Sequence, residues 1–443
     1  MSVFCREVMG VQVVLLSGGS GKRLWPLSNG VRSKQFLKVF QKNQYESESM
    51  LQRVYRQLRD TLGDVRIIIA TAASQVSAIR NQIAEDVEVS VEPCRRDTFP
   101  AILLAALFLR DKKHQPLSEI VLVCPVDPYV GNEYFSVLRE MEKISKEHTD
   151  GLVLMGIQPT YPSEKYGYIL MDGEKAQGFR EKPSVEDAVA YIAQGALWNS
   201  GVFAFRLGYF LECAGKVVDF SGYAELREKY ASLPAISFDY AIAECEERIW
   251  VVRYGGAWKD LGTWNTLTEA MPQQIIGNAI LDDTCQNVHV INELDVPLLC
   301  MGLENVIVSA SPDGILVTNN AQSSYIKPYV EQIMQPVMYA EKSWGTYRVL
   351  DVGEESLTIK VVLNPGHKMH YHSHERREEI WNIVEGEGVA MLDGEERAVH
   401  VGTQIAIPRG MKHSLRAVTV LRVIEVQLGK DISVEDKTKH PYP

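Results

Sequence analysis

The sequence predicts an α/β protein in which a doubly wound sheet is followed by two β-rich parts. Three observations support this prediction. Short apolar runs alternate with longer amphipathic segments up to about residue 150, which is typical of a parallel sheet covered by helices. After residue 271 the apolar runs are short and separated by Asn, Asp and Gly. Seven of the ten histidines lie after residue 366, where short strands broken by Gly replace helical periodicity.

Size and composition are those of an ordinary globular protein. At 443 residues the chain is long enough for two or three domains. A net charge of −11 disfavours nucleic acid as a partner, so a phosphate ligand has to be attracted by local positive charge. The seven cysteines are scattered without a C-x-x-C pair, as expected of reduced thiols. The sequence has neither the apolar core of a signal peptide nor a run of about 18 apolar residues, so we expect a cytoplasmic protein outside the membrane.

The first strand is predicted at 11–16, where the residues VQVVLL suit a strand buried on both faces of a parallel sheet. The elements predicted after it are, in chain order, a helix at 49–62, a strand at 65–70, a helix at 74–83, a strand at 87–92, a helix at 98–109 and a strand at 120–124. In doubly wound sheets, ligands bind beyond the carboxyl ends of the strands. The turn after the first strand therefore lies where a ligand is expected.

That turn, at 17–21, is rich in glycine. Gly18, Gly19 and Gly21 permit backbone conformations closed to other residues, so that successive N–H groups can converge on phosphate oxygens. Arg23 adds a planar charged fork and Lys34 a point charge, and both suit phosphate. The turn matches neither the dinucleotide fingerprint nor the P-loop, and similar turns follow strands in many α/β proteins. The residues predicted to bind nucleotide phosphates are Gly18, Gly19, Ser20, Gly21, Lys22, Arg23 and Lys34.

The wider context of this turn narrows the prediction. GGSGKRLWPLS followed by KQFL resembles the signature of sugar-1-phosphate nucleotidyltransferases, and the pieces WPLS and KQFL are similar to the mannose-1-phosphate guanylyltransferase branch. The resemblance implies a Rossmann-like nucleotidyltransferase domain with GTP and mannose 1-phosphate as substrates. It also implies that the glycine-rich loop, Arg23 and Lys34 bind the leaving pyrophosphate.

Two aspartates are predicted to hold Mg²⁺. Asp127 follows the strand at 120–124 in CPVDPYV, and Mg²⁺ prefers oxygen ligands such as a carboxylate at a strand end. An Asp before Pro is also an ordinary turn opening, and spacing alone favours that interpretation. The resemblance reverses it, because an Asp at this position binds the catalytic metal in the family. Asp260, in WKDLGTW, matches the family's second metal-binding carboxylate, whereas Pro128 stands where the family usually has His.

A segment that begins at Glu92 resembles the nucleotide side of the family's site, and Glu92 is predicted to contact the nucleotide. The match extends over Glu92-Pro93, Arg96 and the residues TFPA at 98–101. Three positions depart from the family's pattern and leave the identity of the base open. At these positions Arg95, Asp97 and Phe99 replace Gly, Asn and Ala.

GIQPTYPSEKYGYI, FREKP and WNSG, in that order, resemble the sugar-binding half of the family. Further on, SFDYAIAE at 237–244 and WKDLGTW at 258–264 complete the family's pattern. Glu181 can accept hydrogen bonds from sugar hydroxyls, Lys182 can meet the sugar phosphate, and Asn199 can both donate and accept. As isolated residues they would be a solvated ion pair and a turn Asn. Three elements in the family's order argue against that. The residues predicted to bind the sugar phosphate are Gly167, Glu181, Lys182 and Asn199.

The last hundred residues contain both motifs of a cupin. GHKMHYHSHERREEIWNIVEG has the spacing of the first motif and GTQIAIPRGMKH that of the second. Two His residues two apart on a strand point to the same face, so His372 and His374 can reach one ion. Glu379 and His413 would complete a ligand set for a divalent transition metal such as Zn²⁺. His370 shares the same alternate face, as a spare ligand or a neighbour.

The resemblance covers essentially the whole chain, in the order of the bifunctional mannose-1-phosphate guanylyltransferase/mannose-6-phosphate isomerase family. It predicts a nucleotidyltransferase domain at 1–271, a short β-rich, β-helix-like connector at 272–335 and a cupin barrel at 336–443. The implied reaction converts GTP and mannose 1-phosphate into GDP-mannose, a precursor used in polysaccharide biosynthesis, and pyrophosphate. Other nucleotides or sugars, a non-catalytic sensor, the cupin metal and a homo-oligomer remain open.

A weak or absent isomerase activity is predicted for the cupin. In the bifunctional family the first ligand position is usually Gln, whereas here it is His372. The family's chain normally closes with an arginine-containing segment that serves the isomerase, whereas this chain closes with DISVEDKTKHPYP. Isomerisation needs a positioned acid or base as well as a metal, so metal binding does not by itself imply the reaction. The alternative of a truly bifunctional enzyme stays open.

Overall fold

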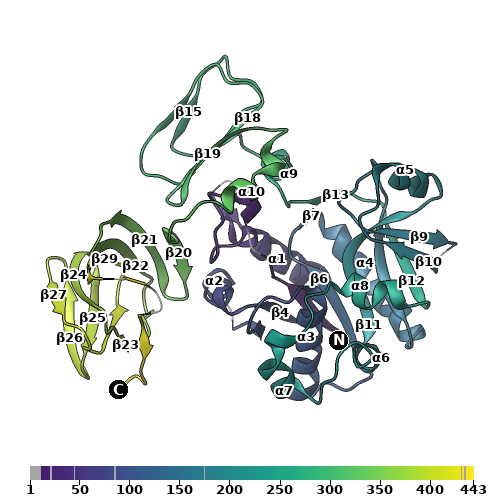
Figure 1. Cartoon of the computed structure of the whole chain (residues 1–443), viewed down its shortest axis with the longest axis horizontal. Helices are drawn as coiled ribbons and strands as arrows, with labels where there is room; N and C mark the ends of the chain where they lie inside the picture. The colour runs from purple at the N-terminus through teal and green to yellow at the C-terminus, as the bar shows by residue number, and fades with distance from the viewer. Residues whose placement is uncertain are drawn as a thin grey trace, which may run out of the picture. The chain divides into compact units, whose positions relative to one another are not determined.

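A computed structural model of the chain describes residues 11–19, 22–43, 45–83, 86–173, 175–430, 432–433 and 436–443 (Figure 1). These residues form two compact units. The first contains the described parts of 1–20, 35–76 and 85–272, and the second those of 21–34, 77–84 and 273–443. The division into three domains at 271 and 335 remains a prediction. Within the described ranges, no helix is long and apolar enough to cross a membrane.

The first unit is built on a nine-stranded sheet in the order β5-β4-β1-β6-β11-β8-β12-β10-β9. Its strands are β1 (Val11–Leu16), β4 (Arg66–Ala72), β5 (Glu88–Glu92), β6 (Ile120–Pro125), β8 (Leu152–Ile157), β9 (Tyr168–Asp172), β10 (Lys175–Arg180), β11 (Leu197–Arg206) and β12 (Ile249–Tyr254). The strands β5, β4, β1 and β6 run parallel, and β11 is antiparallel to β6 and β8. The predicted α/β class is confirmed, with antiparallel strands added to the parallel half.

The helices of this unit include the two predicted at 49–62 and 98–109. The helices are α1 (Met50–Leu62), α3 (Thr98–Lys112), α4 (Asn132–Glu147), α5 (Val185–Ala193), α6 (Leu207–Ala214), α7 (Tyr223–Glu228), α8 (Phe238–Ala241) and α9 (Trp264–Ala270). The Ser49 side chain caps α1 and Gln52 returns the bond, which satisfies two backbone donors at the helix start. The predicted helix at 74–83 is a 3₁₀ turn followed by α2 (Val76–Gln82).

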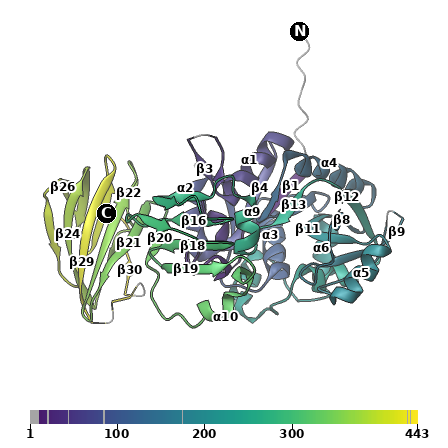
Figure 2. The ribbon, with the colours of Figure 1, turned by 90° about the horizontal axis from the view of Figure 1, so that it is seen from above.

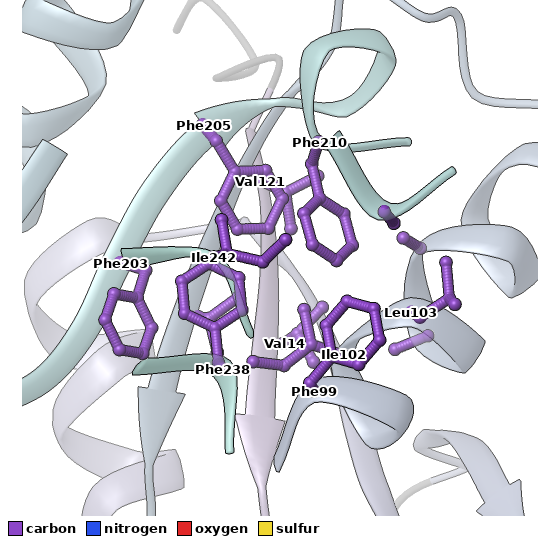
Figure 3. Close-up of a cluster of buried hydrophobic side chains, with 14 of the residues drawn as sticks. Val14, Phe99, Ile102, Leu103, Val121, Phe203, Phe205, Phe210, Phe238 and Ile242 are labelled. Atoms are coloured by element: carbon purple, nitrogen blue, oxygen red, sulfur yellow. The ribbon is translucent and has the colours of Figure 1, made fainter. Parts of the chain in front are cut away.

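A cluster of buried apolar side chains joins α3 to the sheet. The helix is apolar around its whole circumference, as expected of a helix enclosed on all sides. Figure 3 shows Phe238 of α8 within this cluster, together with Phe203 and Phe99. The ring centroids of Phe238 and Phe203 are 4.3 Å apart. The cluster therefore fixes α8 against β11 and α3.

Replacing Phe238 with alanine is expected to lower the free energy of unfolding by about 3–5 kcal/mol, because the substitution removes a fully buried ring and leaves a cavity. Equilibrium unfolding in urea measures the change. Tyr240→Ala is a matched control on the same helix, since Tyr240 is exposed and should cost about 0.5 kcal/mol or less. A similar cost for the two variants would contradict the assignment of Phe238 to the core.

The connector of the second unit is β-rich, as predicted, and its short strands stack in parallel. One sheet contains β14 (Ile275–Gly277), β16 (His289–Asn292), β18 (Val306–Ser311) and the antiparallel β19 (Gly314–Asn319), and the other β15 (Ala279–Leu281) and β17 (Leu298–Cys300). Segment 21–34 belongs to this unit. Arg32 binds Glu293 through two hydrogen bonds of 2.7 and 3.0 Å, and the Asn29 amide donates to Asp313 at 2.9 Å.

The C-terminal part of the second unit is a two-sheet β structure with a buried apolar core, which confirms the predicted cupin-like region. One sheet is formed by β20 (Tyr339–Lys342), β21 (Gly345–Val352), β22 (Ser356–Leu363), β29 (Leu421–Gly429), β24 (Arg377–Glu385) and β27 (Gln404–Ile407). The other is formed by β26 (Glu395–His400), β25 (Glu387–Leu392), β28 (His413–Ala417), β23 (His372–Ser373) and β30 (Thr438–Lys439). Figure 2 shows β22, β29 and β24 side by side.

Candidate active site and metal centre

The glycine-rich loop begins directly after β1 and is held by side chains from three other segments. The amide of Gln35 donates to the carbonyl of Ser17 at 3.1 Å. The carbonyl of Gly19 accepts from Gln75 at 3.2 Å and from Arg95 at 2.8 Å. The φ angle of Gly19 is +119°, a conformation that side chains rarely permit. The start of the loop is therefore fixed in a shape that needs glycine.

Sequence reasoning assigned no role to the three side chains that hold the loop. Gln35 lies in the KQFL piece, so the resemblance pointed to the segment without naming the residue. Arg95 stands at a position where the family usually has Gly, and the structure shows that it reaches the loop. No sequence signal singles out Gln75.

The basic residues predicted to bind phosphate follow the loop. Ser20 and Gly21 lie outside the described residues. Lys22 and Arg23 are exposed in a 3₁₀ turn at Lys22–Leu24, and Lys34 is half-buried at the start of the 3₁₀ turn Lys34–Phe36. The Lys22 ammonium lies 3.9 Å from the Glu331 carboxylate. Because residues 21–34 belong to the second unit, phosphate binding by these side chains stays a prediction.

The two predicted magnesium carboxylates lie in neighbouring segments of the first unit, Asp127 just before β7 (Pro128–Val130) and Asp260 at the end of β13 (Trp258–Asp260). Strands β1 and β6 are parallel neighbours with Leu16 opposite Pro125, so Asp127 follows the strand end adjacent to the glycine-rich loop. The short strands β7 and β13 pair antiparallel, with Asp260 opposite Pro128. The register thus brings Asp260 next to Asp127, although 133 positions separate them in the sequence. Two neighbouring carboxylates fit the oxygen ligands that Mg²⁺ prefers.

The four predicted sugar-phosphate residues lie together in the first unit. The backbone N–H of Asn199 donates to the carbonyl of Gly167 at 2.8 Å. A Cβ atom at Gly167 would lie 2.5 Å from Oε2 of Glu181, so a side chain there would displace that carboxylate. The ammonium of Lys182 forms an ion pair with Glu181. Their role in sugar binding stays a prediction.

Glu92 lies at the end of β5 and is buried. Its carboxylate accepts a hydrogen bond of 2.7 Å from the hydroxyl of Tyr230. Burial raises the pKa of Glu92, although this hydrogen bond and the charge of Arg95 act in the opposite direction. The side chain thus connects β5 to the segment after α7, and its predicted nucleotide contact remains a prediction.

Three histidines of the cupin converge in a buried cluster. Strand β23 places His372 directly opposite His413 of β28. One ring nitrogen from each of His372, His374 and His413 lies within 4.8 Å of the others. His370, the suggested spare ligand, is exposed and does not belong to this cluster.

Each histidine of the cluster uses its Nδ1 atom toward a backbone carbonyl. His372 Nδ1 lies 2.6 Å from the carbonyl of His370, His413 Nδ1 lies 2.9 Å from that of Met411, and His374 Nδ1 contacts that of Asp436. Such contacts fix the tautomer with the lone pair on Nε2, the atom that can bind a metal. Nε2 of His374 also lies 3.0 Å from Nη2 of Arg377. Burial holds the pKa of His372 at about 2, with a further contribution from the charge of Lys437, so its ring is neutral at pH 7. The cluster can therefore hold a divalent metal.

Glu379 lies beside the cluster and is bound by other side chains. Its carboxylate is 3.1 Å from His374 Nε2 and 3.5 Å from His413 Nε2. It also accepts from Arg377 at 3.0 Å and from the Trp381 indole at 3.2 Å. Burial acts to raise the pKa of Glu379, but the histidine contacts outweigh it and hold the pKa well below the usual range. Its place as a fourth metal ligand stays a prediction.

The C-terminal segment contributes to this cupin interior, which sequence reasoning did not foresee. Strand β30 pairs with β23, and Lys439 lies opposite His372. Burial lowers the pKa of Lys437 to about 8 and raises that of Glu425 on β29 to about 8, the latter with help from the charge of Glu379. The closing segment contacts the cluster through Asp436, whose carbonyl meets His374 Nδ1.

Comparisons with known proteins find one family in the first part of the chain and another in the last part. Residues 12–275 match the family described as nucleotidyl transferase, and residues 331–440 match the family described as mannose-6-phosphate isomerase C-terminal. The xanthan biosynthesis protein XanB of Xanthomonas campestris is 29% identical over 96% of each chain. A mannose-1-phosphate guanylyltransferase of Escherichia coli is 29% identical, again over 96% of each chain. A solved structure described as mannose-1-phosphate geranyltransferase of Thermus thermophilus is 29% identical, with a TM-score of 0.62 over 73% of this chain and 99% of that chain.

Proposed function

The chain belongs to the mannose-1-phosphate guanylyltransferase/mannose-6-phosphate isomerase family, and we propose that it transfers the guanylyl group of GTP to mannose 1-phosphate. The products are GDP-mannose and pyrophosphate. The observation that carries the proposal is the strand pairing that brings Asp127 and Asp260 together at the strand end next to the glycine-rich loop. The names of the relatives supply the substrates.

The reaction is an in-line displacement at the α-phosphorus of GTP. A phosphate oxygen of mannose 1-phosphate forms the new bond, and the bond to the β-phosphate oxygen breaks to release pyrophosphate. Mg²⁺ held by Asp127 and Asp260 would neutralise negative charge on the reacting phosphates. The glycine-rich loop, Arg23 and Lys34 are proposed to bind the leaving pyrophosphate. Positioning and electrostatic stabilisation provide most of the rate enhancement, so no general base is assigned.

The sugar side of the site is proposed to consist of Gly167, Glu181, Lys182 and Asn199. The close approach of Glu181 to Gly167 keeps a carboxylate where a sugar hydroxyl could donate to it. Lys182 supplies positive charge for the phosphate of the sugar. The ion pair between Lys182 and Glu181 places a positive charge beside the carboxylate.

A panel of nucleoside triphosphates against sugar 1-phosphates tests the proposed function. Pyrophosphate release should be fastest with GTP and mannose 1-phosphate together, and neither substrate alone should support it. A faster reaction with another pair would reassign the base or the sugar. No release with any pair would favour a sugar-nucleotide sensor.

Arg23→Ala and Lys182→Ala are expected to affect different substrates. Arg23 is proposed to serve the triphosphate and Lys182 the sugar phosphate, so each loss should raise mainly the KM of its own substrate, by about 10-fold or more. Initial rates with each substrate varied in turn give the two values. If both variants weaken only the triphosphate, Lys182 has been placed on the wrong substrate.

The second proposed function is metal binding by the cupin. The observation that favours it is the buried cluster of His372, His374 and His413, whose Nδ1 atoms contact backbone carbonyls. A cluster dominated by imidazole suits Zn²⁺ or a similar divalent metal. We propose that this centre has weak or absent mannose-6-phosphate isomerase activity, because the closing segment lacks arginine and the first ligand position is His372.

A further inference from the structure

Helix α8 carries a carboxylate to which the mechanism above assigns no role. Asp239 is the second residue of this helix, in the SFDYAIAE piece, and Phe238 anchors the helix in the buried cluster of Figure 3. The backbone N–H of Phe238 donates to the hydroxyl of Thr98 at 2.8 Å. The Ser237 hydroxyl accepts from the N–H of Tyr240 at 3.3 Å. Asp239 is therefore held by a rigid segment rather than by a free loop.

The carboxylate of Asp239 contacts the proposed sugar side of the site. The Nδ2 atom of Asn199 donates to Oδ1 of Asp239 at 2.7 Å. The Oδ1 atom of the same amide accepts from the N–H of Gly201 at 3.2 Å. These two bonds fix which way the Asn199 amide faces, and they leave its second N–H for a ligand. Asp239 thus positions a donor and presents an acceptor of its own.

The charges around Asp239 favour a hydroxyl as its partner. Glu181 and Lys182 face it from the segment after β10, and Asn199 faces it from β11. Burial raises the pKa of Asp239 to about 6, and the charge of Glu181 adds to this. In its carboxylate form the group accepts hydrogen bonds through both oxygens. Two carboxylates repel a phosphate, whereas sugar hydroxyls can donate to both of them.

We propose that Asp239 is a specificity-determining residue that accepts a hydrogen bond from one hydroxyl of the sugar, next to a second hydroxyl bound by Glu181. The Asn199 amide lies against Asp239 and donates to the same part of the sugar. This inference rests on the proposed function and adds to it a residue that reads the sugar. Lys182 then remains for the phosphate.

Single-deoxy analogues of mannose 1-phosphate test this role. In the wild type, the analogue that lacks the hydroxyl bound by Asp239 should lose about 10- to 100-fold in kcat/KM, because it leaves a half-buried carboxylate without one of its two donors. In Asp239→Ala the same analogue and mannose 1-phosphate should react with nearly equal kcat/KM. The KM for GTP should change by less than about 3-fold. A merely structural role would not abolish discrimination at one hydroxyl.

Two further variants keep the test decisive. Asp239→Asn preserves the shape of the side chain if the alanine variant fails to fold, and it should also weaken discrimination. Glu247→Gln removes an exposed carboxylate eight positions later, outside the SFDYAIAE piece, and should behave as wild type. If both Asp239 variants are active and discriminate at every hydroxyl as the wild type does, the inference on Asp239 is wrong and the proposed function still stands. A wild type that forms no GDP-mannose would overturn the proposed function and this inference with it.

Discussion

Asp127→Asn and Asp260→Asn should each lower kcat by about 10²-fold or more while the protein remains folded. Each substitution removes one negative charge from the proposed magnesium site and keeps the size of the side chain. The strand pairing places Asp260 opposite Pro128, so the two carboxylates are neighbours and can bind the same ion. The loss of either one should therefore weaken metal binding. Because the metal contacts the reacting phosphates, its weaker binding reduces stabilisation of the transition state.

Pyrophosphate release at several Mg²⁺ concentrations measures this effect. Asp172→Asn is a matched control, since Asp172 is an exposed carboxylate at the end of β9 in the same unit, and it should retain full activity. Circular dichroism and unfolding curves should show that the two active-site variants fold as the wild type does. Wild-type rates at saturating Mg²⁺ in either variant would remove that residue from the metal site.

Purified protein should bind about one divalent metal ion per chain in its cupin, and His413→Ala should weaken that binding by more than about 10²-fold. Loss of a direct ligand should exceed the 10- to 100-fold loss typical of residues that only support ligands. His413 is fully buried and lies opposite His372. A side chain from the protein surface therefore cannot replace the lost ligand unless the barrel changes shape. Elemental analysis and titration with a competing chelator give stoichiometry and affinity.

His370→Ala is the matched control for this variant, because His370 is exposed, adjacent to the cluster in sequence and outside it in space. Its metal affinity should equal that of the wild type. A coupled assay from mannose 6-phosphate to fructose 6-phosphate should show turnover well below about 1 s⁻¹ even with metal bound. Metal-free wild type would contradict the first expectation, and ordinary turnover would contradict the second.

The sequence by itself determined the fold class, the order of the elements and the family. Alternating apolar and amphipathic segments predict strands and helices because backbone hydrogen bonding and burial act within windows of a few residues. The strand at 11–16 and the helix after Ser49 were located for this reason. The cupin motifs were found by spacing within one short stretch, since two adjacent strands and a turn carry them.

Contacts between distant segments were decided only by the tertiary structure. Asn199 and Asp239 lie 40 positions apart, and Glu92 and Tyr230 lie 138 apart. The carbonyl of the C-terminal Asp436 contacts His374, and Arg95 reaches the carbonyl of Gly19. Local periodicity contains no information on these pairs, because they depend on how whole strands and helices pack against one another. Segment 21–34 is the clearest case, since Arg32 in it pairs with Glu293 of a unit whose largest part begins only at residue 273.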